Sequence, residues 1–496
     1  MAELVLDVLS DRVSRYGAKP FLRHEGRVVS YSDFDVETNR AANLLLRLGL
    51  EKGDRATLAL GNRLEYLVLA FGILKAGGVF HPINPALGDA ELSYVLGHAE
   101  PRVVFARAED RERIARVAPK ARVVTAGAEL AELLRGASPE PPPVRVTAED
   151  ASTLLYTSGT TGTPKGVLFR HRSTGAAGRH FLEALRIVPE DTILAVTPLF
   201  HGNAWGAAVT ALQAGATFAF PETFHASRFW PLVHECRATV LYTLGTILAI
   251  LLQQEPSELE RTNPLRVVLG LGSAPVRDEV LRRFGVEHVA ECYGSTDAGV
   301  VTITPFGASP RPGSAGPPVP GVEVRILDDE GRELPVGEVG EICVRSPHRL
   351  AEYFRDPEET RRAFFGEWFR TGDLGYLDRD GWLYFVDRKK DIIRRGGENI
   401  SSVLVEKTLR EHPAVAEVAV VGVPDPVLGQ EVKAFVVPRA PVTEEELRAF
   451  ASARLARFQV PRFWEFRDSL PKTSTQRVEK YKLREEASRG RKPLLG

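Results

Sequence analysis

The chain has 496 residues, more than a single hydrophobic core usually organises, so its length predicts at least two domains. Its 64 Lys and Arg residues are balanced by 65 Asp and Glu residues, and this near-neutral charge argues against a dedicated nucleic-acid-binding surface. A hydrophobic fraction of 44% is ordinary for a globular protein and argues against a disordered chain.

The cysteines and the N-terminus exclude further classes. Cys236, Cys292 and Cys343 lie far apart and form no CxxC pattern, so we expect isolated buried thiols and no disulfide framework or structural zinc. The first residues lack the basic-then-apolar layout of a signal peptide, and the longest apolar run, 239–252, is too short to span a membrane. These features predict a cytoplasmic protein.

The first part of the chain alternates between helical and strand-like patterns. Ser32 and Asp35 have the spacing of a capping pair, and the apolar residues that follow lie on one helical face up to Gly49. A further helix is predicted at 65–75, and short apolar runs predict strands at 56–60, 79–83 and 102–106. This alternation predicts an α/β fold with doubly wound, mostly parallel sheets.

The pattern changes twice in the second half of the chain. After about residue 310, turn residues separate strand-like runs at 322–327 and 341–345, which predicts a small β subdomain. After about residue 390 the pattern predicts a helix at 402–411, strands at 416–423 and 432–437, a helix that starts at Thr443 with Glu446 as its capping partner, and a strand at 463–466. Together these elements predict a separate α+β domain. We therefore predict a large N-terminal domain at 1–389 and a small C-terminal domain at 390–496.

One segment combines glycines, hydroxyls and a lysine in a way that suits phosphate binding. It follows an apolar run and comprises Thr157, Ser158, Gly159, Thr160, Thr161, Gly162 and, after two further residues, Lys165. Glycines let backbone N–H groups approach phosphate oxygens, and the lysine adds positive charge. The segment predicts a polyphosphate loop; a flexible Ser/Gly linker is the alternative.

Two common nucleotide motifs do not fit. In a GxxxxGK count from Gly159, Pro164 occupies the place of the second glycine, so the spacing of a Walker A loop fails. Gly270 and Gly272 lack the third glycine of a dinucleotide fingerprint. Kinases, GTPases and dehydrogenases therefore have little support.

The stretch 157–166 resembles the phosphate loop of the acyl-adenylate-forming superfamily, which includes acyl-CoA synthetases, luciferases and peptide-synthetase adenylation domains. Further segments match that superfamily in the same order over nearly the whole chain; they are 198–201 (PLFH), 272–275 (GSAP), 293–297 (YGSTD), 371–374 (TGDL) and 387–399 (DRKKDIIRRGGEN). Chance does not explain this ordered set of motifs.

The resemblance implies a site for ATP and Mg²⁺. The segment from Thr157 to Lys165 would hold the pyrophosphate that leaves, Thr296 would contact the α-phosphate, and Asp297 with Thr157 would bind Mg²⁺. Most relatives have glutamate where Asp297 stands, and aspartate keeps the charge and oxygen ligands on a shorter side chain.

The resemblance also implies contacts to adenosine. Tyr293 and Gly294 would pack on the adenine beside the loop that contains Gly272, Ser273 and Ala274. Asp373 would accept both ribose hydroxyls, and Arg388 would add a donor. The alternatives are a core tyrosine for Tyr293 and a simple Asx-turn residue for Asp373.

Further residues are implied in acid and CoA binding. His201 resembles the aromatic gate between the acid and CoA sites, although a lone histidine is often structural. Trp205 and 243–246 are candidates for the acid pocket, with ordinary core packing as the alternative. Lys390 aligns with the hinge of a mobile small domain, and Gly396 with Gly397 would let the pantetheine arm pass close to the backbone.

The C-terminal loop departs from the family pattern. Relatives carry Pro-Lys-Thr-x-x-Gly-Lys, whereas this chain has Gln476 and Arg477 in place of the last two residues. Arginine keeps the charge, but its planar fork differs from a compact ammonium group. Three interpretations follow: Arg477 does the work, Lys472 or Lys480 replaces it, or adenylation is impaired. We favour the first because every other ATP-facing motif is present.

The resemblance therefore predicts an ATP-dependent acyl-CoA ligase, with a medium- or long-chain fatty acid as substrate and CoA as co-substrate. A stand-alone adenylation enzyme that loads a carrier protein and a catalytically impaired acyl-AMP-binding homologue are the alternatives; a luciferase-like oxygenase has no specific support. Nucleic acid and an integral membrane segment are not expected, and a homodimer stays open.

Overall fold

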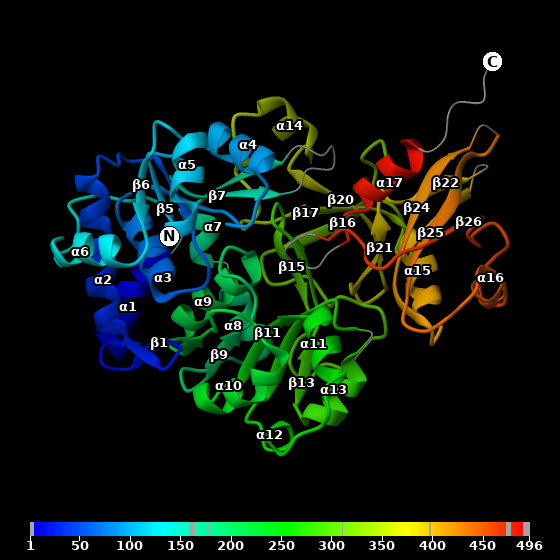
Figure 1. Cartoon of the computed structure of the whole chain (residues 1–496), viewed down its shortest axis with the longest axis horizontal. Helices are drawn as coiled ribbons and strands as arrows, with labels where there is room; N and C mark the ends of the chain where they lie inside the picture. The colour runs from blue at the N-terminus through cyan, green and yellow to red at the C-terminus, as the bar shows by residue number, and fades with distance from the viewer. Residues whose placement is uncertain are drawn as a thin grey trace. The chain divides into compact units, whose positions relative to one another are not determined.

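The computed structural model describes residues 4–157, 164–176, 178–274, 276–309, 311–395, 398–425, 427–472 and 478–489. The chain forms two compact units (Figure 1). The first contains most of residues 1–324 together with Val344–Phe369, and the second contains Arg325–Cys343 and the residues from Arg370 onward. The predicted division after residue 389 stays a prediction.

The first unit contains a mostly parallel sheet with the strand order β13-β12-β11-β9-β10-β1-β2, in which only β1 and β2 are antiparallel. Its strands are β1 (Pro20–His24), β2 (Arg27–Ser30), β9 (Thr192–Ala195), β10 (Thr217–Ala219), β11 (Val240–Leu244), β12 (Val267–Leu271) and β13 (His288–Ala290). Apolar side chains of α10, α11 and α13 pack on strands β9, β11 and β12, as expected for a buried parallel sheet.

A second sheet of the first unit has the order β18-β8-β7-β4-β3-β5-β6, parallel from β7 to β6 and antiparallel at β8 and β18. Its strands are β3 (Arg55–Ala59), β4 (Val79–Pro82), β5 (Val103–Ala106), β6 (Arg122–Thr125), β7 (Ala151–Thr157), β8 (Lys165–Arg170) and β18 (Glu352–Tyr353). Leu92, Leu96 and Ile114 of α4 and α5 pack against β3 and β5.

Helices connect these strands. They are α1 (Val5–Tyr16), α2 (Tyr31–Arg47), α3 (Leu64–Lys75), α4 (Asp89–Ala99), η1 (Ala108–Asp110), α5 (Arg111–Val117), α6 (Ala128–Arg135), α7 (His171–Ala176), α8 (Arg179–Leu185), α9 (Gly202–Ala214), η2 (Ala226–Arg228), α10 (Phe229–Cys236), α11 (Gly245–Leu252), α12 (Glu258–Arg261), α13 (Arg277–Phe284) and α14 (Pro357–Arg362). The predicted alternation of strands and helices, and with it the α/β fold class, is confirmed.

The helix expected to start at Ser32 starts one capping pair earlier, at Ser30. The N-cap is Ser30, whose Oγ accepts from the backbone N–H of Asp33 at 3.0 Å, and not Ser32. The sequence contains the same spacing twice, and tertiary packing selects the earlier one, because Tyr31 is fully buried and donates to the carbonyl of Ala216 at 2.6 Å. Asp35 pairs with Lys75 at 2.6 Å.

Two smaller sheets follow. A hairpin joins β14 (Cys292–Ser295) to β15 (Gly299–Ile303). A five-stranded sheet has the order β16-β17-β20-β19 with β21 beside β20; its strands are β16 (Glu323–Leu327), β17 (Gly340–Arg345), β19 (Phe364–Phe365), β20 (Trp368–Leu377) and β21 (Leu383–Arg388). The strands predicted at 322–327 and 341–345 are thereby confirmed.

The last part of the second unit is an α+β fold. Its sheet has the order β23-β22-β25-β24 with β26 parallel to β25, and Figure 1 shows it in orange and yellow with its helices. Its elements are β22 (Ile393–Arg395), β23 (Glu398–Ile400), α15 (Ser402–Arg410), β24 (Val415–Asp425), β25 (Gly429–Pro438), α16 (Glu444–Ser452), β26 (Phe463–Phe466) and α17 (Lys480–Arg489). Thr443 and Glu446 form the predicted capping box.

Alternation along the long strands explains why this sheet is covered on both faces. Val418 and Val420 of β24 pack with α15 and α16, whereas Ala419 and Val421 pack with Leu483 of α17. Successive side chains of a strand point to opposite faces, so a continuous apolar run needs helices on both sides.

The cysteines are free thiols; Cys236 and Cys343 are buried and Cys292 is half-buried. Burial raises the pKa of Cys236 to about 11, so this thiol is inert at neutral pH. Among the helices in the described ranges, none combines the length and the apolar character needed to cross a membrane.

Buried histidines predict loss of stability in acid. Burial lowers the pKa of His171 to about 4 and that of His81 to about 3, both below the ordinary value of 6.5. The unfolded chain therefore binds more protons as the pH falls from about 6.5 toward 4, and the free energy of unfolding falls with it. We expect His171 alone to contribute about 2 kcal/mol of this loss between pH 7 and pH 5.

Denaturant unfolding at pH 7 and pH 5 measures the effect. The variant His171→Leu should lose less stability between these two pH values than the unmodified protein does. An equal loss in both proteins would contradict the assignment to His171.

Candidate active site

The predicted phosphate loop connects β7 to β8. Thr157 and Lys165 face each other across this antiparallel pair, so the two ends of the loop bring a hydroxyl and an ammonium group together. Gly166, next along β8, is buried, and a Cβ there would lie 3.2 Å from Leu154 and 3.3 Å from Phe354. The loop residues Ser158, Gly159, Thr160, Thr161 and Gly162 lie outside the described residues.

Lys165 is surrounded by acidic and aromatic groups of the same unit. Its Nζ forms an ion pair with Glu359 of α14 and lies 5.2 Å from the ring centroid of Tyr353. The hydroxyl of Tyr353 donates to the carboxylate of Asp297, and burial, together with this carboxylate, raises the pKa of Tyr353 far above its ordinary value. Tyr353 thus links the lysine of the loop to Asp297.

Three more predicted residues share the β14–β15 hairpin with Asp297. Tyr293 and Gly294 lie in β14, and Thr296 lies with Asp297 in the turn. The carbonyl of Asp297 accepts from the N–H of Leu350 at 2.8 Å, which fixes the turn. A Cβ at Gly294 would come within 2.4 Å of the carbonyl oxygen of Gly299, so only glycine fits there.

The loop after β12 is held by a carboxylate that sequence reasoning missed. Glu291 accepts from the N–H of Gly272 at 2.7 Å, the hydroxyl of Ser273 at 3.0 Å and the N–H of Ala274 at 2.9 Å. Burial raises the pKa of Glu291 although these hydrogen bonds oppose the shift. Gly272 has a φ of +72°, which favours glycine. The position of Glu291, two residues before Tyr293, is the sequence signal that could have indicated it.

His201 precedes α9 as its N-cap residue. Its ring packs on Phe200 with centroids 4.5 Å apart, and burial lowers its pKa to about 4, so the ring is neutral at pH 7. A neutral imidazole is compatible with a gate beside an apolar acid and offers no charge for proton transfer.

The candidates for the acid pocket differ in their surroundings. Trp205 of α9 packs against Phe71 and Phe80 with centroid distances of 5.7 and 5.0 Å, as core packing predicts. Thr243, the penultimate residue of β11, has a buried hydroxyl with no hydrogen-bond partner among the described residues. A Cβ on Gly245 would lie 2.0 Å from the carbonyl oxygen of Gly272, so the backbone there approaches the loop held by Glu291.

In the second unit, Asp373 and Arg388 are register partners on β20 and β21. Arg388 Nε lies 3.6 Å from Asp373 Oδ1, and the N–H of Asp373 donates to the hydroxyl of Thr371 at 3.1 Å. Asp373 lies inside the ten-residue strand β20 and follows Gly372, which has a φ of +70°. Its side chain is largely buried beside the guanidinium group.

A second missed carboxylate supports this strand pair. Glu341 of β17 is buried and accepts from Arg370 at 2.9 Å and from Lys389 at 2.8 Å. Burial alone would raise the pKa of Glu341, but these two cations outweigh burial and hold it below its usual value. Its other oxygen lies 3.3 Å from the N–H of Gly372.

Removal of the Glu341 carboxylate should destabilise the folded protein. We expect Glu341→Ala to lower the free energy of unfolding by about 3 kcal/mol, because Arg370 loses its buried partner and Lys389 keeps only the exposed carboxylate of Asp329. Denaturant unfolding measures this, with the exposed Glu330→Ala in the same unit as the control. A loss below 1 kcal/mol would contradict the structural role assigned to Glu341.

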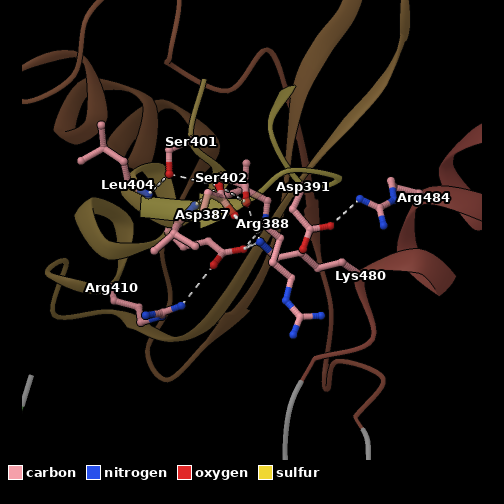
Figure 2. Close-up of polar contacts among 12 residues, drawn as sticks. Asp387, Arg388, Asp391, Ser401, Ser402, Leu404, Arg410, Lys480 and Arg484 are labelled. Atoms are coloured by element: carbon pink, nitrogen blue, oxygen red, sulfur yellow. Dashed lines mark hydrogen bonds and ion pairs between the residues drawn. The ribbon is translucent and has the colours of Figure 1, made fainter. Parts of the chain in front are cut away.

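The predicted hinge residue Lys390 lies between residues that form hydrogen bonds and an ion pair with α15 and α17 (Figure 2). Lys390 is exposed, and its carbonyl accepts from Arg484 at 3.2 Å, while Asp391 pairs with Arg484 at 2.7 Å. Asp387 accepts from the hydroxyl of Ser402 at 2.9 Å and from that of Ser401 at 3.1 Å, the N-cap residue of α15. The residues that flank Lys390 are thereby anchored to the small fold.

The two lysines considered as substitutes for Arg477 already have partners. Lys472 pairs with Glu417 at 2.7 Å, and Lys480 pairs with the buried Glu406 at 2.7 Å and donates to Ser402. These bonds favour structural roles for both lysines. Arg477, Gly396 and Gly397 lie outside the described residues.

The donor set for a metal is small. The described residues contain no group of three or more His, Cys, Asp or Glu side chains arranged to hold an ion. Asp297 and Thr157 offer a carboxylate and a hydroxyl, both half-buried, and these hard oxygen donors fit Mg²⁺, which usually takes one or two protein ligands and completes its shell with phosphates and water.

Comparison with known proteins agrees with this geometry. Residues 9–354 match the family described as AMP-binding enzyme, and residues 404–477 match the AMP-binding enzyme C-terminal domain. A crotonobetaine/carnitine–CoA ligase from Citrobacter koseri is 33% identical, with 96% of this chain and 97% of the relative covered.

Solved structures give the same result. ATP-bound MatB from Rhodopseudomonas palustris has a TM-score of 0.92 at 32% identity, with 98% of this chain and 99% of that one covered. A Mycobacterium tuberculosis fatty acyl CoA synthetase has a TM-score of 0.79 at 30% identity, with coverages of 98% and 99%.

The chain therefore belongs to the AMP-binding enzyme family, within the acyl-adenylate-forming superfamily. It is an AMP-forming acid–thiol ligase that uses ATP and CoA. The resemblance seen in the sequence and the predicted fold class are both confirmed.

Proposed function

We propose that the enzyme converts a medium- or long-chain fatty acid into its CoA thioester through an acyl-adenylate. In the first step a carboxylate oxygen attacks the α-phosphorus of ATP and pyrophosphate leaves. In the second step the thiol sulfur of CoA attacks the acyl carbonyl, the thiol proton passes to solvent, and AMP leaves with its bridging oxygen. The observation that carries the proposal is the link from Lys165 through Tyr353 to Asp297.

Residues of the first unit would act on the phosphates. Lys165, at the end of the phosphate loop, would neutralise charge that builds on the leaving pyrophosphate, and Thr296 would donate to the α-phosphate. Asp297 and Thr157 would hold Mg²⁺, which supplies positive charge to the phosphate oxygens when bound. The carboxylate of the acid is already ionised at neutral pH, so no general base is needed.

Two groups of predicted residues are assigned to adenosine: Tyr293 with the loop 272–274 for the adenine, and Asp373 with Arg388 for the ribose. Tyr293 would stack on the adenine, and the loop held by Glu291 would present its backbone to the same ring. Asp373 would accept the ribose hydroxyls and Arg388 would add a donor; Arg388 Nε lies 3.6 Å from Asp373 Oδ1, which places the two side chains side by side. Arg477, Gly396 and Gly397 are assigned to catalysis and to CoA passage from the sequence resemblance alone, and Lys390 to the hinge.

The neutral character of the acid-pocket candidates supports an uncharged acyl chain. His201 is neutral because burial lowers its pKa to about 4, and Trp205 lies among buried phenylalanines. A carnitine-type acid is the second candidate, because the relative named above acts as a crotonobetaine/carnitine–CoA ligase. Such an acid carries a quaternary ammonium group, which needs an aromatic cage or a carboxylate.

Release of AMP against a panel of acids, with and without CoA, tests the proposal. We expect saturated fatty acids of medium or long chain to give the highest kcat/KM with CoA, and carnitine and crotonobetaine to give little product. The reverse order would support the carnitine-type assignment. Release of AMP only with an added carrier protein would support a stand-alone adenylation enzyme, and no acid-dependent AMP would support an impaired homologue.

A homodimer and a cytoplasmic location are part of the same proposal. ATP and CoA are both available in the cytoplasm, and the near-neutral composition of the chain does not oppose self-association. Sedimentation equilibrium tests the first point, and fractionation of cells tests the second.

A further inference from the structure

The cation at the end of the phosphate loop already has a counter-ion. Lys165 Nζ pairs with Oε1 of Glu359, and the two side chains are only 22% and 29% exposed. The residues are 194 positions apart in the sequence, so the fold brings them together within one compact unit. A pair with this degree of burial is screened less by salt than an exposed pair.

The local structure holds Glu359 in place. The carboxylate of Asp356 caps α14 by accepting from the N–H of Glu359 at 2.9 Å. The hydroxyl of Thr360 accepts from the N–H of Tyr353 at 3.0 Å and ties the same helix to β18. Since β18 pairs with β8, the strand that starts with Lys165, the carboxylate is fixed relative to the lysine.

We propose that Glu359 is an affinity-determining residue: it is the counter-ion that the terminal phosphates of ATP must displace from Lys165. The inference rests on the proposed role of Lys165 in phosphate binding. A carboxylate beside the ammonium group cancels part of its attraction for phosphate and repels the incoming triphosphate. Glu359 thereby weakens nucleotide binding and favours departure of pyrophosphate, because it re-forms the ion pair once the phosphates leave.

The neighbouring residue supplies a matched control. Glu358 lies on the same short helix, but its carboxylate pairs with Arg362 of that helix, and both side chains are exposed. Glu358→Gln removes the same charge one residue away without touching Lys165. A general effect of net charge would appear in both variants, and an effect of the counter-ion only in Glu359→Gln.

The experiment compares Glu359→Gln, Glu358→Gln and the unmodified enzyme at low ionic strength and saturating Mg²⁺. Acid-dependent AMP release gives KM for ATP and kcat, and titration calorimetry gives the Kd of inorganic pyrophosphate with Mg²⁺. We expect Glu359→Gln to lower both KM and Kd by about threefold to tenfold, with kcat within about twofold, as befits a partly exposed ion pair. Glu358→Gln should leave both unchanged.

A double-mutant cycle separates this inference from the proposed function. Lys165→Ala should raise KM for ATP. Glu359→Gln should then change KM by a different factor in the Lys165→Ala background than in the unmodified enzyme, because the ion pair that the phosphates displace is absent. An unchanged or increased KM in Glu359→Gln, with Lys165→Ala still impaired, would overturn the counter-ion role and leave the proposed function standing. An unchanged KM in Lys165→Ala would overturn both.

Discussion

Asp297→Ala should slow acid-dependent pyrophosphate release by about 100- to 1,000-fold, the range typical when one group that stabilises transition-state charge is removed. Asp297 is the carboxylate that the turn of the β14–β15 hairpin presents to the hydroxyl of Tyr353. Its loss removes the oxygen ligand assigned to Mg²⁺. Single-turnover measurement of pyrophosphate at varied Mg²⁺ detects the change.

Two variants separate metal binding from packing. Asp297→Glu should keep most of the activity, because glutamate supplies the same oxygen ligands on a longer arm and is the residue most relatives carry. Tyr353→Phe removes only the hydroxyl that donates to Asp297, and we expect a loss of about tenfold or less from one hydrogen bond to a charged group. Full activity in Asp297→Ala would contradict the metal-binding role.

Arg477→Ala should slow adenylation by about 100-fold or more while thioester formation from added acyl-adenylate stays within a few-fold. Arg477 stands where relatives carry the lysine that reaches the acid carboxylate and the α-phosphate. In the proposed assignment, its positive charge would act in the first half-reaction, where two anions meet. Stopped assays of each half-reaction measure the two rates.

The lysines that could replace Arg477 supply control variants for this experiment. Lys472→Ala and Lys480→Ala should change adenylation little, because their amines pair with Glu417 and Glu406. Arg477→Lys should restore the compact ammonium group of relatives and keep the reaction measurable. Equal slowing of both half-reactions in Arg477→Ala would refute the assignment.

The helices and strands that local patterns predicted have local causes. The capping box of Thr443 and Glu446 depends on residues three apart, and β26 occurs at the predicted residues 463–466. The start of α2 was misplaced because two identical spacings compete, and the burial of Tyr31 decides between them. Local spacing alone does not contain that information.

The carboxylates that complete the candidate site were missed for a related reason. Glu291 acts on a loop 17 to 19 residues away, Glu341 pairs with Lys389 across 48 residues, and Glu359 meets Lys165 across 194. An acidic residue whose partner is distant looks like any other surface charge in the sequence. The motif residues were identified because their order along the chain matches that of a known family. Charge and periodicity alone would not have identified them.

The central claim is activation of an acid as its adenylate, and exchange of labelled pyrophosphate into ATP tests it most directly. The assay contains the enzyme, Mg²⁺, ATP and a fatty acid, with CoA left out. We predict acid-dependent exchange under these conditions, and loss of exchange in Asp297→Ala. Absence of exchange with every acid of the panel, or formation of ADP and phosphate instead, would contradict the account.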